Sequence, residues 1–264
     1  MQLGLNYSMN IVAVIPARLS SSRFPRKVLF PILGLPMVEH VRRRALLSNA
    51  VTDVFVATPD KEVADLIRGF GGRVIMTSDE HLNGTTRVAE AVASIDCSHV
   101  LLLQGDEPLL LPRHMDLFAK AIAVNQIGEA WNATSQIEKA DELDLKSFVK
   151  CTVSASGKIQ YCFRRTPYFS TFEVQRSFVH KMLGIIAFRK DFLIQLTSFF
   201  PSVVEKAESI EQIRIIENGK NLQSVLVFPS LPSVNEPHEV ELVLEVLRQD
   251  FEQQAILHKI LISI

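Results

Sequence analysis

The feature that constrains this chain most is the regular alternation of strand-like and helix-like segments in its first half. The strand-like segments are short runs of apolar side chains, and the segments between them carry apolar side chains at helical spacing. Such alternation predicts an α/β fold with a mostly parallel, twisted sheet and helices on both faces, connected by right-handed crossovers. We expect strands at Ile11–Ile15, Val54–Ala57, Arg73–Met76 and Val100–Leu103, and helices at Met37–Ser48, Lys61–Phe70, Thr86–Ile95 and Leu117–Val124.

The second half of the chain has a different pattern, with shorter apolar runs that indicate partly antiparallel strands. No stretch rich in Gly or Ser marks a linker. We therefore expect a single domain over residues 1–264, with a smaller β-rich lobe in the second half. We expect strands at Phe148–Ser154, Lys158–Phe163, Met182–Phe188 and Leu222–Phe228, a helix at Glu205–Glu217, and a long terminal helix at Glu239–Ile262.

Composition and charge argue against several classes of protein. The 264 residues carry a formal net charge of −1, which gives no field for holding a nucleic-acid backbone. The apolar runs are too short to span a membrane, so we expect neither a nucleic-acid nor a membrane partner. Met1–Asn10 lacks the features of a secretory signal, and we expect it to be a short leader. Cys97, Cys151 and Cys162 show no CxxC spacing, which favours reduced thiols and a cytoplasmic location.

A basic, polar segment follows the first predicted strand. Residues 16–27 read PARLSSSRFPRK, with three serines, three arginines and one lysine. Charge-assisted hydrogen bonds from Arg and Lys are the strong way to hold a polyphosphate. The segment contains neither GxGxxG nor GxxxxGKS/T, which argues against a dehydrogenase-type dinucleotide site and against a P-loop. By itself the segment could equally be a solvated basic loop.

An acidic pair follows the predicted strand Val100–Leu103. The chain continues as Gln104-Gly105-Asp106-Glu107-Pro108, at the sheet edge where parallel folds bind ligands. Asp106 would supply the hard oxygen ligand that Mg²⁺ prefers, and Mg²⁺ needs only one or two carboxylates in addition to phosphate oxygens. Gly105 would let the backbone approach a ligand closely. The alternative is ordinary turn or helix-cap chemistry ahead of the proline.

Together these motifs resemble those of one enzyme family. Residues 15–27 fit the pattern IPARxxSxRxPxK, residues 76–91 fit MTSxEHxxGTxRVAEA, and residues 101–108 read LLLQGDEP. The predicted helix that includes residues 205–214 is similar to the family's sugar-site helix. On these motifs the chain resembles the 3-deoxy-manno-octulosonate (Kdo) cytidylyltransferases, or CMP-Kdo synthetases, from about Asn10 to Val246.

The resemblance implies a nucleotidyltransferase fold related to the GT-A glycosyltransferases, a homodimer and Mg²⁺-dependent chemistry. It also implies that residues 10–125 form a nucleotide-binding half, 126–235 a sugar-binding and dimerisation lobe, and 236–264 a C-terminal helix. The implied reaction transfers CMP from CTP to Kdo, giving CMP-Kdo and pyrophosphate for lipopolysaccharide synthesis. In this reaction the anomeric hydroxyl of the sugar attacks the α-phosphorus in line, and the protein mainly positions reactants and neutralises charge.

The resemblance also implies a set of site residues. Arg18, Lys27 and Asp106 would be catalytic: the two cations would neutralise the triphosphate, with Arg23 nearby, and Asp106 would hold the metal. The cytidine pocket would be lined by Ala17, Thr58, Gly84 and Arg87. The acidic sugar would be contacted by Gln104, Arg164, Glu211 and Gln212.

One departure from the family concerns the metal site. The family's second metal-binding Asp lies in a segment like VDTPEDLE, and the matching residues 233–240 here read SVNEPHEV, with Asn235 at that position. An amide oxygen can still ligate Mg²⁺, but it brings no negative charge, so metal affinity should fall. Asn is also a good N-cap, and the terminal helix is expected to follow directly.

The other departure concerns the sugar pocket. Where the family reads RHLGIYGY, residues 181–188 read KMLGIIAF, so that Met182 replaces a His and Ile186 replaces a Tyr. We therefore expect a more apolar sugar pocket. This leaves two alternatives open: a cytidylyltransferase for a modified acidic sugar such as 8-amino-Kdo, and a catalytically silent paralogue that only binds nucleotide. The intact basic loop and Asp106 favour an active enzyme.

Overall fold

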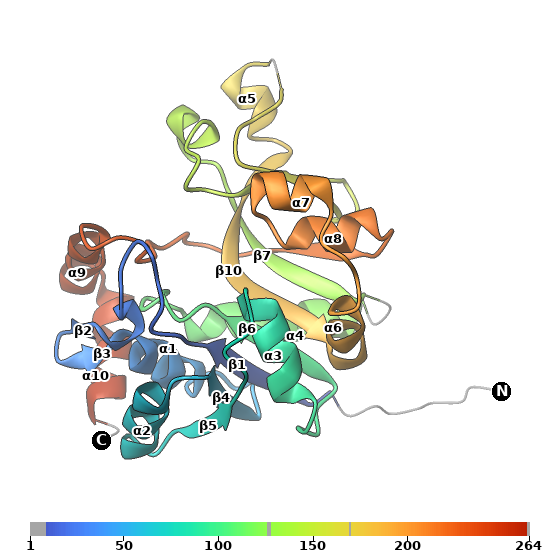
Figure 1. Cartoon of the computed structure of the whole chain (residues 1–264). Helices are drawn as coiled ribbons and strands as arrows, with labels where there is room; N and C mark the ends of the chain where they lie inside the picture. Colours follow the sequence, from blue (N-terminus) through green and yellow to red (C-terminus); the bar gives the residue numbers. More distant parts are fainter. Residues whose placement is uncertain (1–8, 126–127, 169, 263–264) are drawn as a thin grey trace.

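The computed structural model describes residues 9–125, 128–168 and 170–262 (Figure 1), so residues 1–8 of the expected leader lie outside the described residues. A mixed nine-stranded sheet forms the centre of the molecule, with strands in the order β11-β7-β10-β6-β1-β4-β5 and a β8–β9 hairpin attached through β10. The bounds along the main path are β1 (Ile11–Pro16), β4 (Asp53–Thr58), β5 (Arg73–Met76), β6 (His99–Leu103), β7 (Ala130–Gln136), β10 (Val179–Arg189) and β11 (Leu222–Leu226).

The pairing of the strands confirms the predicted mostly parallel α/β architecture. β1 pairs in parallel with both β4 and β6, β4 pairs in parallel with β5, and β7 pairs in parallel with β11. β10 alone in this path is antiparallel to its neighbours β6 and β7. The carboxyl ends of β1, β4 and β6 therefore meet at one edge of the sheet, where ligands bind in folds of this kind.

Helices cover both faces of the sheet, because alternate side chains of the central strands are apolar and point to opposite faces. Ile11, Ala13 and Ile15 of β1 pack against the apolar sides of α1, α2 and α4, whereas Val12 and Val14 pack against α3, α6 and α8. These helices are α1 (Met37–Ala45), α2 (Lys61–Gly69), α3 (Gly84–Val92), α4 (Pro112–Val124), α6 (Lys190–Leu196) and α8 (Gln212–Glu217).

The smaller lobe is attached to the main sheet through β10. The first residues of β10, Val179–Lys181, pair with β8, and its last residues, Ile185–Arg189, pair with β6. In Figure 1, β10 runs from the lobe near α5 down into the main sheet, and α5 lies at the end of the molecule opposite α2. The lobe contains η2 (Ala140–Leu143), β8 (Lys150–Val153), β9 (Ile159–Phe163) and α5 (Phe172–Gln175).

Three features of the second half differ from the sequence prediction. The expected helix at residues 205–217 is two helices, α7 (Val203–Glu208) and α8, because Ser209 between them adopts a left-handed conformation with φ 55°. The buried ion pair between Glu205 and Arg214 holds the two helices together across this turn. Strand β7 was not predicted, since Asn132, Thr134 and Ser135 make its sequence polar, and its central place in the sheet buries all three.

The expected long terminal helix is also divided, into α9 (Glu239–Gln249) and α10 (Phe251–Ile262). Asp250 between them has extended backbone angles, and its carboxylate accepts a hydrogen bond from the backbone N–H of Gln253, which starts the second helix. No helix within the described ranges has the length and apolarity needed to cross a membrane.

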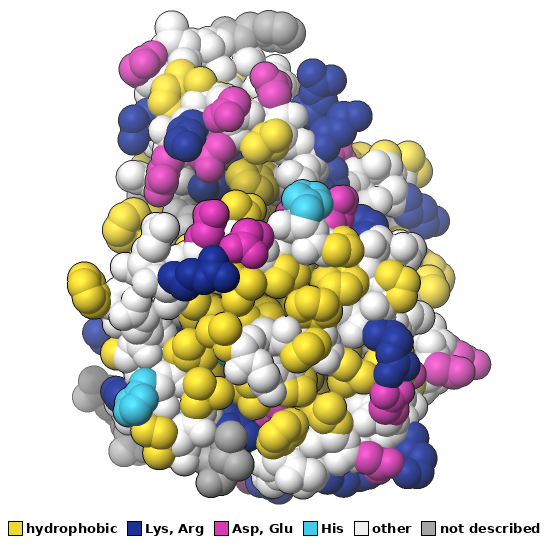
Figure 2. Space-filling model, turned by 90° about the vertical axis from the view of Figure 1, so that its left-hand side faces the viewer, with side chains coloured by type: hydrophobic (Ala, Val, Ile, Leu, Met, Phe, Trp, Pro, Cys, Tyr) yellow, Lys and Arg dark blue, Asp and Glu magenta, His cyan; other side chains and the backbone are white. Residues whose placement is uncertain are grey.

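The two terminal helices pack on α1 and on the small hairpin formed by β2 (Pro31–Ile32) and β3 (Leu35–Pro36). Figure 2 views the molecule from this side and shows that apolar side chains gather on the surface there. Leu242 of α9 and Phe251 of α10 are exposed apolar side chains of the terminal helices, with exposed fractions of 50% and 86%. Contiguous exposed apolar surface of this kind is typical of an interaction face.

Candidate functional site

A cleft of about 250 Å³ lies at the carboxyl ends of β1 and β6. Its walls are the loop after β1, the start of α3 with the residues before it, and the turn after β6. Eight of the site residues predicted from the sequence line this cleft, and the fold brings them together from three separate segments. They are Ala17, Arg18, Arg23, Lys27, Gly84, Arg87, Gln104 and Asp106.

The loop after β1 is closed by its own backbone. The carbonyl of Leu19 accepts hydrogen bonds from the N–H groups of Ser21 and Arg26, both at 3.0 Å. Arg26 adopts a left-handed conformation with φ 60°, which turns the chain back toward the sheet. The Asp60 carboxylate, just after β4, accepts from the N–H of Leu19 at 2.8 Å. The basic segment is therefore an ordered wall of the cleft rather than a solvated tail.

Lys27 and Asp106 meet at the floor of the cleft. The Lys27 ammonium forms an ion pair with the Asp106 carboxylate, and the two side chains are only 14% and 20% exposed. Lys27 also donates to the carbonyl of Val234 at 3.3 Å, and the Val234 N–H donates to the carbonyl of Asp106 at 2.9 Å. The segment before α9 is thereby fastened to both the basic loop and the acidic turn.

Asn235 lies beside this pair. Its side-chain oxygen accepts a hydrogen bond from Arg23 at 3.2 Å, and its amide nitrogen donates to Ser233. The N-cap of α9 is His238, so the helix-cap interpretation of Asn235 is wrong. Within the described part of the chain, the Asn235 side chain accepts no hydrogen bond from the helix. Instead, the carboxylate of Glu239, in the first turn of α9, accepts hydrogen bonds from the backbone N–H groups of Asn235 and Glu236. The Asn235 oxygen consequently faces the basic loop.

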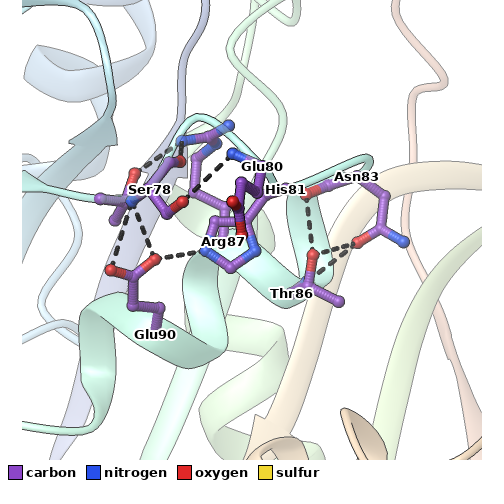
Figure 3. Close-up of polar contacts among 8 residues, drawn as sticks. Ser78, Glu80, His81, Asn83, Thr86, Arg87 and Glu90 are labelled. Carbon is purple, nitrogen blue, oxygen red and sulfur yellow. Dashed lines mark hydrogen bonds and ion pairs between the residues drawn. The ribbon is translucent and has the colours of Figure 1, made fainter.

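The amino end of α3 forms another wall of the cleft. The Asn83 side chain caps the helix by accepting from the N–H of Thr86 at 2.9 Å, as Figure 3 shows. A Cβ on Gly84 would lie 3.1 Å from the Pro16 ring, so the glycine lets the helix start close to the end of β1. The N–H groups of a helix start favour negatively polarised atoms, so this wall suits an oxygen acceptor on a ligand in the cleft.

Arg87, on the first turns of α3, is almost completely buried at the back of the cleft. Its guanidinium donates to the Thr77 hydroxyl at 2.6 Å and to the Ser78 carbonyl at 2.9 Å. Burial lowers the pKa of Arg87, and the positive charge of Arg18 lowers it further. Two cations thus face one cleft, an arrangement that a bound anion would stabilise.

His81, which the sequence analysis did not select, also lines the cleft. Its Nε2 contacts the Glu90 carboxylate, and the same carboxylate accepts from the backbone N–H of Ser78 at 3.1 Å (Figure 3). The hydrogen bond from His81 lowers the pKa of Glu90. These contacts hold residues 78–83 against α3 and so fix the outer rim of the cleft.

Five predicted residues lie outside the lining of this cleft: Asn235, described above, and four others. Thr58 is fully buried at the end of β4, where its hydroxyl accepts from the Asp60 N–H. The Arg164 guanidinium donates to three backbone carbonyls, those of Glu208, Lys146 and Ser209. Glu211 and Gln212 line a separate small pocket next to Thr85, and Gln212 donates to the Asn132 side chain at 3.3 Å.

The two replacements expected to make the sugar pocket more apolar lie in or against the core. Ile186 is only 3% exposed, within the apolar cluster that packs α3, α6 and α8 on the sheet, and Met182 is partly buried against the same cluster. The expectation is therefore wrong for Ile186. Its position in β10 points it into the core.

Glu107 is the residue that sequence reasoning missed most clearly. Its carboxylate accepts from the backbone N–H of Gly184 at 2.8 Å. Burial raises the pKa of Glu107 to about 7, and the negative charge of Asp106 acts in the same direction. The acidic pair of Asp106 and Glu107 is visible in the sequence. The pattern does not indicate, however, that Glu107 contacts β10 whereas Asp106 contacts Lys27.

The donors present fit a magnesium ion that takes most of its ligands from a substrate. The described residues contain no group of three or more His, Cys, Asp or Glu side chains that could hold a metal alone. They do place the Asp106 carboxylate in the lining of the cleft, paired with Lys27, and the Asn235 carboxamide oxygen against Arg23, another lining residue. Mg²⁺ commonly binds through one or two protein oxygens, with phosphates and water completing the octahedron.

Comparison with known proteins agrees with this geometry. The Cytidylyltransferase family model matches residues 12–222. The chain is 36% identical over 250 residues to a 3-deoxy-manno-octulosonate cytidylyltransferase from Geobacter sulfurreducens, an alignment that covers 91% of this chain and 100% of that protein. It is 34% identical over 247 residues to the protein of the same name from Escherichia coli, covering 92% of this chain and 98% of that one.

Solved structures lead to the same family. CMP:2-keto-3-deoxy-manno-octonic acid synthetase, solved in complex with CTP, matches with a TM-score of 0.85 and 34% identity, covering 92% of this chain and 100% of that chain. A cytidylyltransferase from Leptospira borgpetersenii matches with a TM-score of 0.64 at 14% identity, covering 96% and 94% of the two chains, and so supports the fold alone. The resemblance found in the motifs is confirmed: this chain belongs to the 3-deoxy-manno-octulosonate cytidylyltransferases, a family of nucleotidyltransferases.

Proposed function

We propose that this protein transfers CMP from CTP to 3-deoxy-D-manno-octulosonate, giving CMP-Kdo and pyrophosphate for lipopolysaccharide synthesis. The observation that carries the proposal is the cleft, in which the basic loop after β1 faces Asp106 at the carboxyl end of β6. A triphosphate needs clustered cations, and an attacking sugar hydroxyl needs a fixed position next to the α-phosphate. The basic loop of the cleft supplies clustered cations, and the relatives that match over nine-tenths of the chain support the proposal by their shared name.

The charges in the cleft suggest how the reaction proceeds. Arg18 and Lys27, with Arg23 beside them, would neutralise the triphosphate and stabilise the leaving pyrophosphate. The cytidine would occupy the side of the cleft formed by Ala17, Gly84 and Arg87, with buried Thr58 supporting that wall. Since phosphoryl transfer leaves little covalent work to the protein, positioning and charge neutralisation supply most of the rate enhancement.

The metal would be Mg²⁺, held by Asp106 and Asn235. When bound, Mg²⁺ supplies charge neutralisation at the phosphates and lowers the pKa of a coordinated hydroxyl. Asp106 is paired with Lys27 in the protein alone, so the carboxylate is already oriented toward the cleft. Arg23 orients the Asn235 oxygen in a similar way.

The acidic sugar would be bound between the cleft and the lobe, with Gln104 on one side and Glu211 and Gln212 on the other. The Gln212 side chain is linked through Asn132 to β10, which is also where Gln104 is anchored. Arg164 holds residues 208–209 next to Glu211, and its direct contact with the sugar stays a prediction.

We further propose a homodimer in the cytoplasm. The apolar face over the terminal helices in Figure 2 supports self-association, since the lobe expected to mediate dimerisation need not be the whole interface. Light scattering on the purified protein would give either the mass of one chain, 29.6 kDa, or twice that mass. The mass of a single chain at micromolar concentration would contradict the dimer.

The direct test of the reaction is pyrophosphate release with CTP, Mg²⁺ and Kdo, followed by the same assay with the 8-amino analogue of Kdo. CTP-dependent release with Kdo is the expected result. Release with the analogue only would replace Kdo by a modified sugar as the substrate. Binding of CTP without release with either sugar would identify a silent nucleotide-binding paralogue and overturn the proposal.

A further inference from the structure

The strand that joins the lobe to the main sheet is interrupted in its middle. β10 pairs with β7 at Met182 and again at Ile186, but these residues face Thr134 and Asn132, so β10 uses four residues where β7 uses two. This is a bulge, and it lies where β10 stops pairing with β8 and starts pairing with β6. Backbone groups inside a bulge lose their ladder partners and must find others.

The backbone groups of the bulge are satisfied by a side chain of β7 and by the turn that follows β6. The carbonyl of Leu183 accepts from the Asn132 side chain at 3.0 Å, and the N–H of Gly184 donates to the Glu107 carboxylate at 2.8 Å. The carbonyl of Gly184 accepts from the backbone N–H of Gln104 at 3.2 Å. Gly184 is therefore bonded on both sides to the turn that follows β6.

Steric contact requires glycine at position 184. A Cβ on Gly184 would lie 2.3 Å from the Glu107 carboxylate oxygen and 2.8 Å from Cγ of Gln104. Real Cβ atoms are not found at such distances, so only glycine allows the turn to lie this close to β10. The side chain of Gln104 rests over Gly184 for the same reason.

The turn held in this way carries two residues to which the proposed function assigns roles. Gln104 and Asp106 lie at its first and third positions, and Glu107 is its fourth. The Lys27 ion pair fixes the Asp106 side chain from the opposite side of the cleft, but it does not fix the backbone that places Gln104. On the other side of the bulge, Asn132 accepts from Gln212, the expected sugar contact of the lobe.

We propose that Glu107 is a positioning residue, which sets the distance between the metal-site half and the sugar-site half of the cleft by clamping the 104–107 turn to Gly184 of β10. The proposal rests on the proposed function, because it assigns Glu107 a role in bringing the sugar to the nucleotide. Asn132 and Gly184 complete the clamp, the first by holding the Leu183 carbonyl and the second by leaving room for the carboxylate.

The experiment compares Glu107→Ala with Glu107→Gln. Alanine removes the acceptor for the Gly184 N–H, whereas glutamine keeps an oxygen at the same position. We expect Glu107→Ala to lower kcat by about 10- to 100-fold and to raise KM for the sugar, because a misplacement of about 1 Å can cost that much. Binding of CTP without Mg²⁺ should stay within about twofold of the wild-type value, since the basic loop is untouched, and Glu107→Gln should restore most of kcat.

A matched control is Glu129→Ala. Glu129 is likewise a partly buried carboxylate that accepts from a backbone N–H, that of Asn221 at 3.0 Å, but it lies away from the cleft. The Glu129→Ala variant should lose some stability and keep the wild-type kcat and KM. Equal kinetic losses in Glu129→Ala and Glu107→Ala would overturn a specific positioning role, as would wild-type kcat and KM in Glu107→Ala.

Hydrogen exchange at the Gly184 amide provides a readout that does not require turnover. Exchange should accelerate at least about tenfold in Glu107→Ala and stay slow in Glu107→Gln. Unchanged protection in Glu107→Ala would overturn the clamp even if the enzyme is active. If the wild-type protein releases no pyrophosphate with either sugar, the proposed function fails, and the exchange measurement still decides whether Glu107 holds the turn.

Discussion

The ammonium of Lys27 and the carboxylate of Asp106 form an ion pair although the two residues are 79 positions apart in the chain. One residue is expected to hold phosphate and the other to hold a metal, and in the protein alone each neutralises the other. A nucleotide with its metal offers both of them new partners of the correct sign. The pair therefore keeps a partly buried cation and anion in place before the substrate arrives.

Removing the Asp106 carboxylate should abolish turnover but preserve the fold. We expect Asp106→Ala to lower pyrophosphate release by at least about 10²-fold, because one preorganised electrostatic contact at a reacting centre contributes that much. CTP binding without Mg²⁺ should be unchanged or tighter, because Lys27 is released for the phosphates. Calorimetric titration and thermal unfolding measure both points. A near-normal rate would show that the metal assignment is wrong.

Lys27 should contribute mainly to nucleotide affinity. We expect Lys27→Met to raise Kd for CTP by about 10-fold or more, since a charge-assisted hydrogen bond contributes roughly 1.5–3 kcal/mol. Lys61→Met is the matched control, because Lys61 lies on α2 with its side chain 85% exposed. The control should bind CTP as the wild type does. Equal affinities for all three proteins would remove Lys27 from the nucleotide site.

Asn235 should weaken the response to Mg²⁺ compared with a carboxylate at the same position. Asn235→Asp adds a negative charge beside Arg23 and Asp106, so the Mg²⁺ concentration for half-maximal rate should fall several-fold. Asn125→Asp makes the same charge change at the far end of α4 and serves as the control. A Mg²⁺ dependence that is identical in all three proteins would place Asn235 outside the metal site.

Buried His40 should make the fold sensitive to acid. Burial lowers the pKa of His40 from 6.5 to about 4, and the charges of Arg44 and Arg43 add to this effect. The unfolded chain therefore takes up the proton first as pH falls. The associated stability is fully present above pH 6.5 and is lost on acidification toward pH 4, by about 3 kcal/mol.

Urea unfolding at pH 7.5 and 4.5 tests this dependence on His40. When the pH is lowered from 7.5 to 4.5, the wild type should lose more of its free energy of unfolding than His40→Gln does. The difference between the two losses should be about 2–3 kcal/mol. Glutamine can still donate to the Ile32 carbonyl, which His40 contacts at 2.8 Å, so the variant should fold. Parallel pH profiles for the two proteins would exclude His40 as the source.

Arg164 should contribute to stability through its backbone contacts. Its guanidinium donates to the carbonyls of Glu208, Lys146 and Ser209, so Arg164→Ala leaves three acceptors without these donors. Because two of these contacts are solvent-exposed and water can replace the lost donor there, we expect the free energy of unfolding to fall by about 0.5–1.5 kcal/mol. Arg165→Ala, at the exposed neighbouring position, should have no such effect. A higher KM for the sugar with unchanged stability would instead indicate direct contact with the substrate.

The fold could be predicted as far as local pattern determines it. The apolar runs that became β1, β4 and β6 are buried on both faces, as expected for strands inside a parallel sheet between helices, whereas β5, at the edge of the sheet, is only partly buried. The pattern failed where tertiary contacts overrode it. β7 is polar in sequence and central in the sheet, and the helix expected at residues 205–217 is interrupted because the Glu205–Arg214 pair stabilises a turn at Ser209.

By itself, then, the sequence determined the chemistry available to the protein: a basic loop after the first strand, a carboxylate after the strand Val100–Leu103, and an amide at Asn235. These residue types are given by the covalent structure and do not depend on the fold. Only the tertiary structure decided which of them meet, because strand order and a bulge in β10 set distances that no local pattern contains. It paired Lys27 with Asp106, directed Glu107 to Gly184, and placed Ile186 in the core.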